Sequence, residues 1–406
     1  MGDSSTIVDR LRRAFNRRRL LDTLTRLIGV PSPTGQAGSV ADCLAEILTQ
    51  DGFSVQRVVG GHPAAPAVVV RFQAAVPGRT LQFDGHLDTV HLPFVPPVVE
   101  GDRITGSGAS DMKSGVAAAV EATRMLRDTN SLQLGSILFT AHDLHEAPWG
   151  FGQQLDSMIA EGYVGDAVLI PEPLSDRLPV IGRGCAVWKA MIRRPGPPIH
   201  EVMRPVDEPG VILAGSLVAH RLDQLDRSLS DRADPLAGSE SVFIGQIHSG
   251  EIYNQYPQEC WLEGTRRWLP GRERGAVEME FRNLLQKVAQ ETGTTIQTDF
   301  QFIRDAFWLD TSNDAVQAFQ AAHAALQAQE LPVGPKPFVD DGNCFWGRAR
   351  VPAITHGPLA GGQHTINEWA SLADLERVAT LYALTAVIYC QTHASTPETP
   401  QGHPSI

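Results

Sequence analysis

The chain has 406 residues, which is longer than a single hydrophobic core usually grows, so two domains are expected. Hydrophobic residues make up 42% and charged residues 20% of it, as in globular proteins, and the net charge of -12 argues against binding to nucleic acid. No apolar run approaches the ~20 residues that cross a bilayer, so no membrane span is expected. The basic N-terminal segment is interrupted by Asp22 and Arg26, and the five cysteines are scattered. These features predict a cytoplasmic protein without a signal peptide.

Helices and short apolar strands alternate over the first part of the chain. The spacing of apolar residues predicts helices at 11–28, 40–50 and 112–126, and strands at 67–72, 80–83, 136–141 and 166–170. Buried strands that alternate with helices favour an α/β domain, in which helices flank a central mixed sheet.

The order of the elements changes from Cys185 onward. A strand at 186–194, a helix at 209–219, strands at 241–248 and 260–268, a helix at 274–291 and a strand at 295–303 are predicted. This β-α-β-β-α-β order is that of ferredoxin-like α+β domains. A helix at 313–327, an apolar segment at 351–358 and a last helix at 372–390 are expected to complete the first domain. The Pro/Ser/Thr-rich residues 393–406 are expected to form a flexible tail.

Five side chains of the types that bind metal ions lie at strand ends or in loops of the larger domain. His86 follows a predicted strand in GHLDTV, and Asp88 is placed to accept the second ring N–H of His86 and so fix its tautomer. Taken singly, each of the five has an ordinary role as a turn residue, helix N-cap or surface group. Because ligands gather at the carboxyl ends of strands in α/β sheets, the set suggests a Zn²⁺ or Mn²⁺ site. The candidate ligands are His86, Asp111, Glu146, Glu172 and His364.

Several segments resemble motifs of the metallopeptidase superfamily that includes acetylornithine deacetylase, succinyl-diaminopimelate desuccinylase, aminoacylase and glutamate carboxypeptidase. They are LIGVPSPTG, GHLDTV, GSGASDMKSG, NQYPQECWLEGTRRWLP and HGPLAGGQHTINE, and the similarity extends over nearly the whole chain. The resemblance implies a catalytic domain over 1–184 and 305–392 with two neighbouring metal sites, and an inserted lid over 185–304 that usually dimerises. It also implies a homodimer or higher homo-oligomer that holds one or two ions of Zn or Mn per subunit, with Co as a further candidate.

The resemblance assigns roles to individual residues. Asp111 would bridge the two ions. In the lid, His200 would form a hydrogen bond to the reacting oxygen, often in the site of the partner subunit. Asn254 and Arg267 would hold the carboxylate of a small-molecule substrate, since the guanidinium fork of Arg binds carboxylates through two parallel hydrogen bonds. Without the resemblance, His200 and Arg267 would be an ordinary loop residue and an ordinary strand residue.

The segment DLHEAP departs from the pattern of the superfamily, which has two consecutive glutamates here. Glu146 keeps the position of the second, a metal ligand, and His145 occupies the position of the first, the general base. His145 is a candidate base because its unperturbed pKa of ~6.5 lies close to the operating pH. Alternatively, it is a ligand or a donor to the substrate, or the site is inactive. Retention of all five candidate ligands argues against inactivity.

The sequence thus predicts a metal-dependent hydrolase in which metal-activated water cleaves a C–N bond, amide or amidine-like, of a small carboxylate-bearing substrate. Pro148, Trp149 and Phe151 follow the candidate base, and an aromatic wall there would suit a flat substrate, although core packing explains these residues equally. Two alternatives are a hydrolytic deaminase of an electron-poor aminoaryl acid, such as a nitroanthranilate, and a metal-binding homologue without activity.

Overall fold

A computed structural model describes residues 4–391, which form two compact units. The described part of unit 1 consists of residues 4–180, 309–334 and 340–391, and unit 2 consists of residues 181–308 and 335–339. The second unit is therefore an insertion into the first. Residues 181–184, 305–308 and 335–339, which cluster with unit 2, were expected in the first domain. The tail predicted at 393–406 lies outside the described residues.

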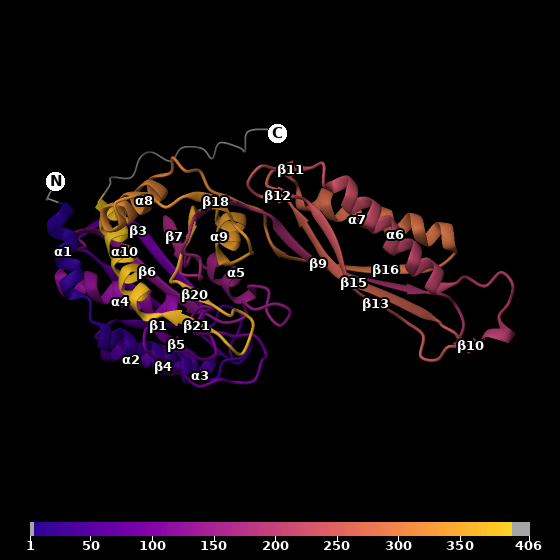
Figure 1. Ribbon diagram of the computed structural model, residues 1–406, viewed down its shortest axis with the longest axis horizontal. Helices are drawn as coiled ribbons and strands as arrows, with labels where there is room; N and C mark the ends of the chain where they lie inside the picture. Colours follow the sequence, from indigo (N-terminus) through magenta and orange to yellow (C-terminus); the bar gives the residue numbers. More distant parts are fainter. Residues whose placement is uncertain (1–3, 392–406) are drawn as a thin grey trace. The chain divides into compact units, whose positions relative to one another are not determined.

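The core of unit 1 is a six-stranded mixed sheet in the order β1-β2-β6-β3-β7-β19 (Figure 1). Strands β6, β3, β7 and β19 run parallel, whereas β1 and β2 pair antiparallel. The bounds of these strands are Val55–Val58 (β1), Ala67–Gln73 (β2), Val76–His86 (β3), Leu134–His142 (β6), Ala167–Ile170 (β7) and Ala353–Thr355 (β19). Parallel strands end at the same edge, so the residues after β6, β3 and β7 are brought together.

Helices cover both faces of this sheet. The ring of Phe83 in β3 stacks on Tyr382 of α10, whereas Leu138 in β6 packs with Met158 of α5. Because Phe83 pairs with Phe139, the neighbour of Leu138, the two helices lie on opposite faces. The helices of unit 1 are Ser4–Ala14 (α1), Arg17–Ile28 (α2), Gly38–Gln50 (α3), Lys113–Thr129 (α4), Gln153–Ala160 (α5), Asp314–Gln327 (α8), Asp341–Ala349 (α9) and Leu372–Gln391 (α10). A second sheet joins Ala360–Gly361 (β20), Trp369–Ser371 (β21), Arg103–Thr105 (β5) and Val98–Glu100 (β4).

Unit 2 is an antiparallel four-stranded sheet with two helices, α6 and α7, packed on it (Figure 1). The elements follow in the order Gly184–Arg193 (β9), Val211–Leu229 (α6), Ser241–Ser249 (β13), Glu259–Trp268 (β15), Arg274–Thr292 (α7) and Thr295–Arg304 (β16). The strand order is β13-β15-β9-β16, and Trp188 packs against Phe281 in the core between sheet and helices.

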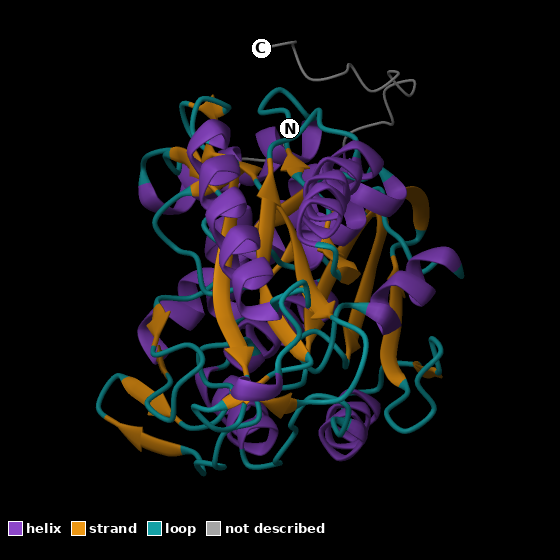
Figure 2. Cartoon of the chain, turned by 90° about the vertical axis from the view of Figure 1, so that its right-hand side faces the viewer, coloured by secondary structure: helices purple, strands orange, loops and turns teal. Residues whose placement is uncertain are grey.

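Short elements complete the chain. They are Leu178–Gly182 (β8), Phe307–Trp308 (β17) and Val333–Pro335 (β18) in one sheet, the pairs Ile199–His200 (β10) with Gln255–Tyr256 (β14) and Ala233–Asp234 (β11) with Gly238–Ser239 (β12), and a 3₁₀ helix at Glu201–Met203 (η1). Helices and strands both make up a large share of the described chain, and the predicted α/β fold class with an inserted α+β unit is confirmed (Figure 2). No helix within residues 4–391 is long and apolar enough to cross a membrane.

Two helix predictions were wrong in extent. The single helix expected at 11–28 is divided into α1 and α2, because the side chain of Asn16 accepts a hydrogen bond from the backbone N–H of Arg19 and starts a new helix. The helix expected at 209–219 begins at Val211 and continues to Leu229. Its outer face is polar beyond residue 219, which weakened the apolar spacing on which the prediction relied.

Candidate metal centre

Three neighbouring parallel strands deliver side chains to one edge of the central sheet. His86 is the last residue of β3, Glu146 follows the end of β6, and Glu172 follows the end of β7. Asp111 stands in the loop that precedes α4, and His364 in the turn between β20 and β21. The topology of the sheet therefore brings together residues that are far apart in the sequence.

These five side chains form two groups that share Asp111. The His86 Nε2 atom lies 3.0 Å from Asp111 Oδ1 and 3.5 Å from Glu172 Oε1. The His364 Nε2 atom lies 3.4 Å from Asp111 Oδ2 and 3.2 Å from Glu146 Oε2. Two ligands of one tetrahedral zinc ion lie about 3.3–3.6 Å apart, given metal–ligand bonds of about 2.0–2.2 Å. The donor atoms thus fit two ions, with the two oxygens of Asp111 directed one to each.

Asp88 binds the backbone of the segment that contains His145, in addition to its contact with the ring of His86. Its buried carboxylate accepts hydrogen bonds from the backbone N–H groups of His145, at 3.1 Å, and Glu146, at 3.0 Å. The ring Nδ1 of His86 lies 3.0 Å from the backbone carbonyl of Asp88 and 3.6 Å from its carboxylate. Burial raises the pKa of Asp88, but His86 outweighs this and lowers it to about 2. The expected contact to His86 is therefore made mainly by the carbonyl oxygen.

The same segment is fixed from its other side by Asp143. The buried carboxylate of Asp143 accepts hydrogen bonds from the backbone N–H groups of Gly35, Ala37 and Leu144, at 2.9, 3.0 and 2.6 Å. Leu144 adopts a left-handed conformation with φ of 65°, which is uncommon for a residue with a branched side chain. Such conformations persist only where the surroundings enforce them, as they do here beside His145.

Carboxylates surround the histidine ligands closely enough to change their protonation. Hydrogen bonds with Asp111 and Glu146 raise the pKa of His364 to about 10. Burial and the charge of Asp111 raise the pKa of Glu172 to about 7. A histidine must be unprotonated to bind a metal ion, so binding at this centre displaces protons.

We therefore expect binding of Zn²⁺ to the chelated protein to release protons at pH 7. The raised pKa keeps His364 protonated at that pH, so the affinity for the ion should rise as the pH increases. Calorimetric titrations in two buffers with different ionisation enthalpies measure the number of protons released. Identical heats in both buffers would contradict the expectation.

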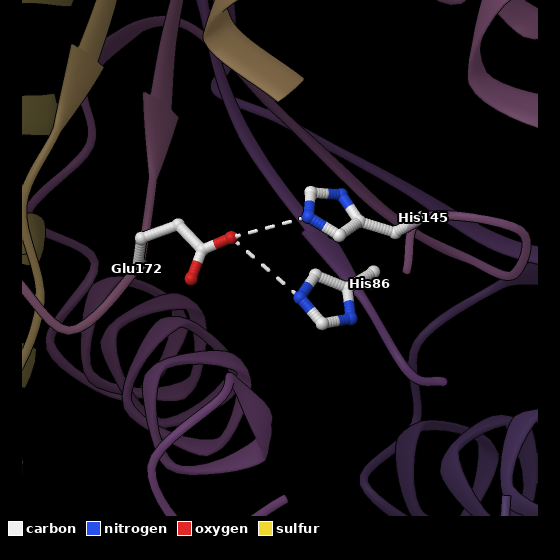
Figure 3. Close-up of side chains that lie close together, drawn as sticks. All are labelled: His86, His145 and Glu172. Atoms are coloured by element: carbon white, nitrogen blue, oxygen red, sulfur yellow. Dashed lines mark ion pairs between the residues drawn. The ribbon is translucent and has the colours of Figure 1, made fainter. Parts of the chain in front are cut away.

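The imidazole of His145 lies beside two of the candidate metal ligands, His86 and Glu172 (Figure 3). Its ring stacks on that of His86, with centroids 3.9 Å apart and planes inclined by 9°. Its Nε2 atom lies 3.8 Å from Glu172 Oε1, and its Nδ1 atom lies 2.8 Å from Asp341 Oδ1. An ionised carboxylate at this distance can only accept a hydrogen bond from Nδ1.

The stacking bears on the role of His145. An imidazole nitrogen donates its lone pair in the plane of its ring. The rings of His145 and His86 lie in nearly parallel planes, so an ion placed in the plane of one ring lies far out of the plane of the other. The nearly parallel rings therefore direct their in-plane lone pairs along separate planes rather than toward one point, although a nitrogen of each ring and a carboxylate oxygen of Glu172 lie within 4.8 Å of one another and could hold an ion.

Two residues that support the site were not predicted from the sequence. Asp341, the first residue of α9, contacts His145 across a separation of 196 residues. The carboxylate of Glu368 accepts hydrogen bonds from the backbone N–H groups of Ser110, at 3.1 Å, and Asp111, at 3.3 Å. The acidic character of VDDGN and INEW was visible in the sequence, but nothing local linked either segment to the metal-binding motifs.

The three remaining candidate residues belong to unit 2, and they do not all lie together. His200 and Asn254 are neighbours, with His200 Nε2 3.2 Å from Asn254 Nδ2. Arg267 lies near the opposite end of the sheet, where it pairs with Cys185 at the start of β9. The length of β15 from Glu259 to Arg267 alone is roughly 26 Å. Within one chain, Asn254 and Arg267 cannot both touch the same small carboxylate.

Comparisons with known proteins agree with this architecture. Residues 83–387 match the family described as "Peptidase family M20/M25/M40". A succinyl-diaminopimelate desuccinylase from Methylorubrum extorquens is 27% identical over 382 residues, which cover 88% of this chain and 95% of that protein. A tripeptidase from Staphylococcus aureus superposes with a TM-score of 0.78 at 19% identity, over 93% of this chain and 100% of the other. A dinuclear metal-binding peptidase of the M20 family from Bacillus subtilis gives a TM-score of 0.69 at 17% identity, over 94% and 99%.

Proposed function

The chain belongs to peptidase family M20/M25/M40 and is a metal-dependent hydrolase, and within that family we propose that it cleaves an amide C–N bond of a small carboxylate-bearing substrate. The observation that carries the proposal is the pair of ligand groups joined by Asp111, with the Nε2 atom of His145 beside them. The similar sequences include a succinyl-diaminopimelate desuccinylase, whose name describes removal of a succinyl group. We also propose a cytoplasmic location, as expected from the sequence.

The site would hold two divalent ions, Zn²⁺ or Mn²⁺, with Co²⁺ as a further candidate. One ion would be held by His86, Asp111 and Glu172, and the other by Asp111, Glu146 and His364. When bound, the ions supply Lewis acidity, which makes water more acidic and stabilises negative charge on the substrate. His145 accepts the proton of the attacking water at Nε2 as the new C–O bond forms. It then returns this proton to the leaving nitrogen as the C–N bond breaks, so that acid and amine are released and His145 is regenerated.

A substrate panel tests this function. The protein, loaded with Zn²⁺, Mn²⁺ or Co²⁺, is incubated with N-succinyl and N-acetyl amino acids, di- and tripeptides, and the corresponding amides without a carboxylate. We expect hydrolysis of one amide class and a preference for the carboxylate-bearing member. A Glu146→Gln preparation, purified in parallel, controls for contaminating hydrolases. Turnover of no amide by protein of proven metal content would overturn the proposal.

One observation favours keeping the aminohydrolase alternative in the panel. The indole of Trp149 stacks on the ring of His91, with centroids 4.1 Å apart and planes inclined by 5°, and remains 43% exposed. Both residues lie in loops that continue directly from metal-binding motifs, so a flat ring near the site has an aromatic surface available. Release of ammonia from a nitroanthranilate, without cleavage of amides, would establish the deaminase.

We propose that the protein works as a homodimer or higher homo-oligomer. Strand β13 is an edge of the sheet in unit 2, and its Phe243 and Ile247 are 63% and 51% exposed. An edge strand with exposed apolar side chains is suited to pairing with another chain. In such an assembly, His200 and Asn254 of one subunit would serve the site of another, which removes the conflict between the positions of Asn254 and Arg267.

Subunit mixing tests this arrangement. Inactive His200→Ala protein mixed with inactive Glu146→Ala protein should regain about a quarter of the wild-type rate after random exchange, because half of the dimers are mixed and each of these has one intact site. Each variant mixed with itself is the control. If exchange is demonstrated with labelled subunits and no activity returns, His200 acts within its own subunit or has another role.

A further inference from the structure

A buried row of acids and imidazoles lies behind His145. The carboxylate of Asp341 stands between two histidines, with Oδ1 2.8 Å from His145 Nδ1 and Oδ2 3.3 Å from His142 Nε2. The same His142 Nε2 atom lies 3.3 Å from Asp84 Oδ2, and Thr140 donates its hydroxyl proton to the other oxygen of Asp84. The side chains of Asp341, His142 and Asp84 are inaccessible to solvent. The base of the proposed function is thus attached to a polar network inside the protein.

We propose that Asp341 is the positioning residue of His145, and that it holds the proton on Nδ1 so that Nε2 is unprotonated and can accept a proton from water. This inference rests on the proposed role of His145. It adds a residue that does not touch the substrate but fixes both the orientation and the tautomer of the base. A histidine requires such a partner because its two nitrogens are interchangeable as donor and acceptor.

The surroundings of Asp341 keep it ionised. It is the first residue of α9, where the helix dipole favours a negative charge. Burial alone would raise its pKa, but the interactions with His145 and His142 outweigh burial and lower the pKa well below its usual value, and the charge of His142 remains when His145 is neutral. An ionised carboxylate can only accept hydrogen bonds, so it enforces the donor role of the Nδ1 atom of His145.

His142 is the second fixed point of the network. Its Nδ1 atom faces the backbone carbonyl of Asp143 at 3.2 Å, and its Nε2 atom faces two carboxylates. The carbonyl of Asp143 and the ionised carboxylate of Asp341 are acceptors, so both ring nitrogens act as donors and His142 is an imidazolium. Its positive charge offsets the burial of the ionised Asp341, since a buried ion without a partner is strongly destabilising. Burial raises the pKa of Asp84.

The substitution Asp341→Asn tests the positioning role, because an amide offers one acceptor and one donor. The charged His142 can only donate, so it should bind the oxygen of the new side-chain amide. The NH₂ group of that amide then faces His145. The Nδ1 atom of His145 must then accept, and its proton moves to Nε2. We expect kcat to fall by about 10²- to 10⁴-fold, the usual contribution of a general base, with little change in KM.

A direct readout of the tautomer separates positioning from a general structural effect. In the ¹⁵N NMR spectrum of the zinc-loaded protein, His145 should be protonated at Nδ1 in the wild type and at Nε2 in Asp341→Asn. The matched control is Asp340→Asn. Asp340 is the N-cap of the same helix, where Asn is an equally good cap, and it binds the hydroxyl of Thr355 rather than a histidine. This control should keep the wild-type tautomer and rate.

The outcomes distinguish this inference from its alternatives. A wild-type His145 protonated at Nε2, or an unchanged tautomer in Asp341→Asn, would overturn it, and the first of these needs no variant to fold. Since Asp84, His142 and Asp341 are also metal-ligand types, metal content is measured in parallel. Loss of a metal equivalent in Asp341→Asn would identify the network as an ion site instead. The NMR result holds even if no amide substrate is found, so failure of the proposed function is recognised separately.

Discussion

Complete removal of divalent metal ions is expected to abolish hydrolysis, and addition of Zn²⁺, Mn²⁺ or Co²⁺ is expected to restore it. Three carboxylates, of Asp111, Glu146 and Glu172, converge with two histidines at the ends of β3, β6 and β7. Without the ions the site lacks the Lewis acidity on which water activation depends. Dialysis against a chelator, elemental analysis and reconstitution with each metal measure the effect.

Variants link this loss to the proposed ligands. Because Asp111 is shared by both groups, Asp111→Asn should lower the affinity for both ions, whereas Glu146→Ala should affect one. Ion binding to the native state alone also stabilises it, by about 2.7 kcal/mol at a concentration 100-fold above Kd, so the Tm should rise with added metal. Full activity in protein that elemental analysis shows to be free of metal would refute a metal-dependent mechanism.

The elements that the sequence predicted well are those with long and regular apolar patterns. The apolar run at 136–141 lies in β6, and the Ala-rich segment at 112–126 covers most of α4, because burial dominates the local energetics of both, with residues 113–126 of α4 all buried. Helix α9 escaped prediction. It spans only nine residues and contains two glycines, and it begins with a capping box formed by Asp340 and Asn343, so it depends on its cap and on tertiary packing rather than on propensity.

The site shows the same limit of sequence reasoning. The candidate ligands His86, Asp111 and His364 each lie in a short motif that can be recognised from the neighbouring residues. Their placement near strand ends could be inferred from the α/β pattern. Contacts between distant segments have no such signature. The link between His145 and Asp341 joins the loop after β6 to the start of α9, and no local pattern specifies that pairing.

His145→Ala is expected to reduce kcat by about 10²- to 10⁴-fold while the metal content stays unchanged. The reason is that its Nε2 atom faces Glu172 while its ring stacks on His86, so it lies beside the residues that would hold the ions. The rate should fall as the pH drops through the pKa of this group, since a protonated imidazole cannot accept a proton. His145→Glu, which restores a carboxylate base, is the matched variant and should retain part of the activity. Loss of metal in His145→Ala would make the residue a ligand, and retention of both metal and rate would remove it from the mechanism.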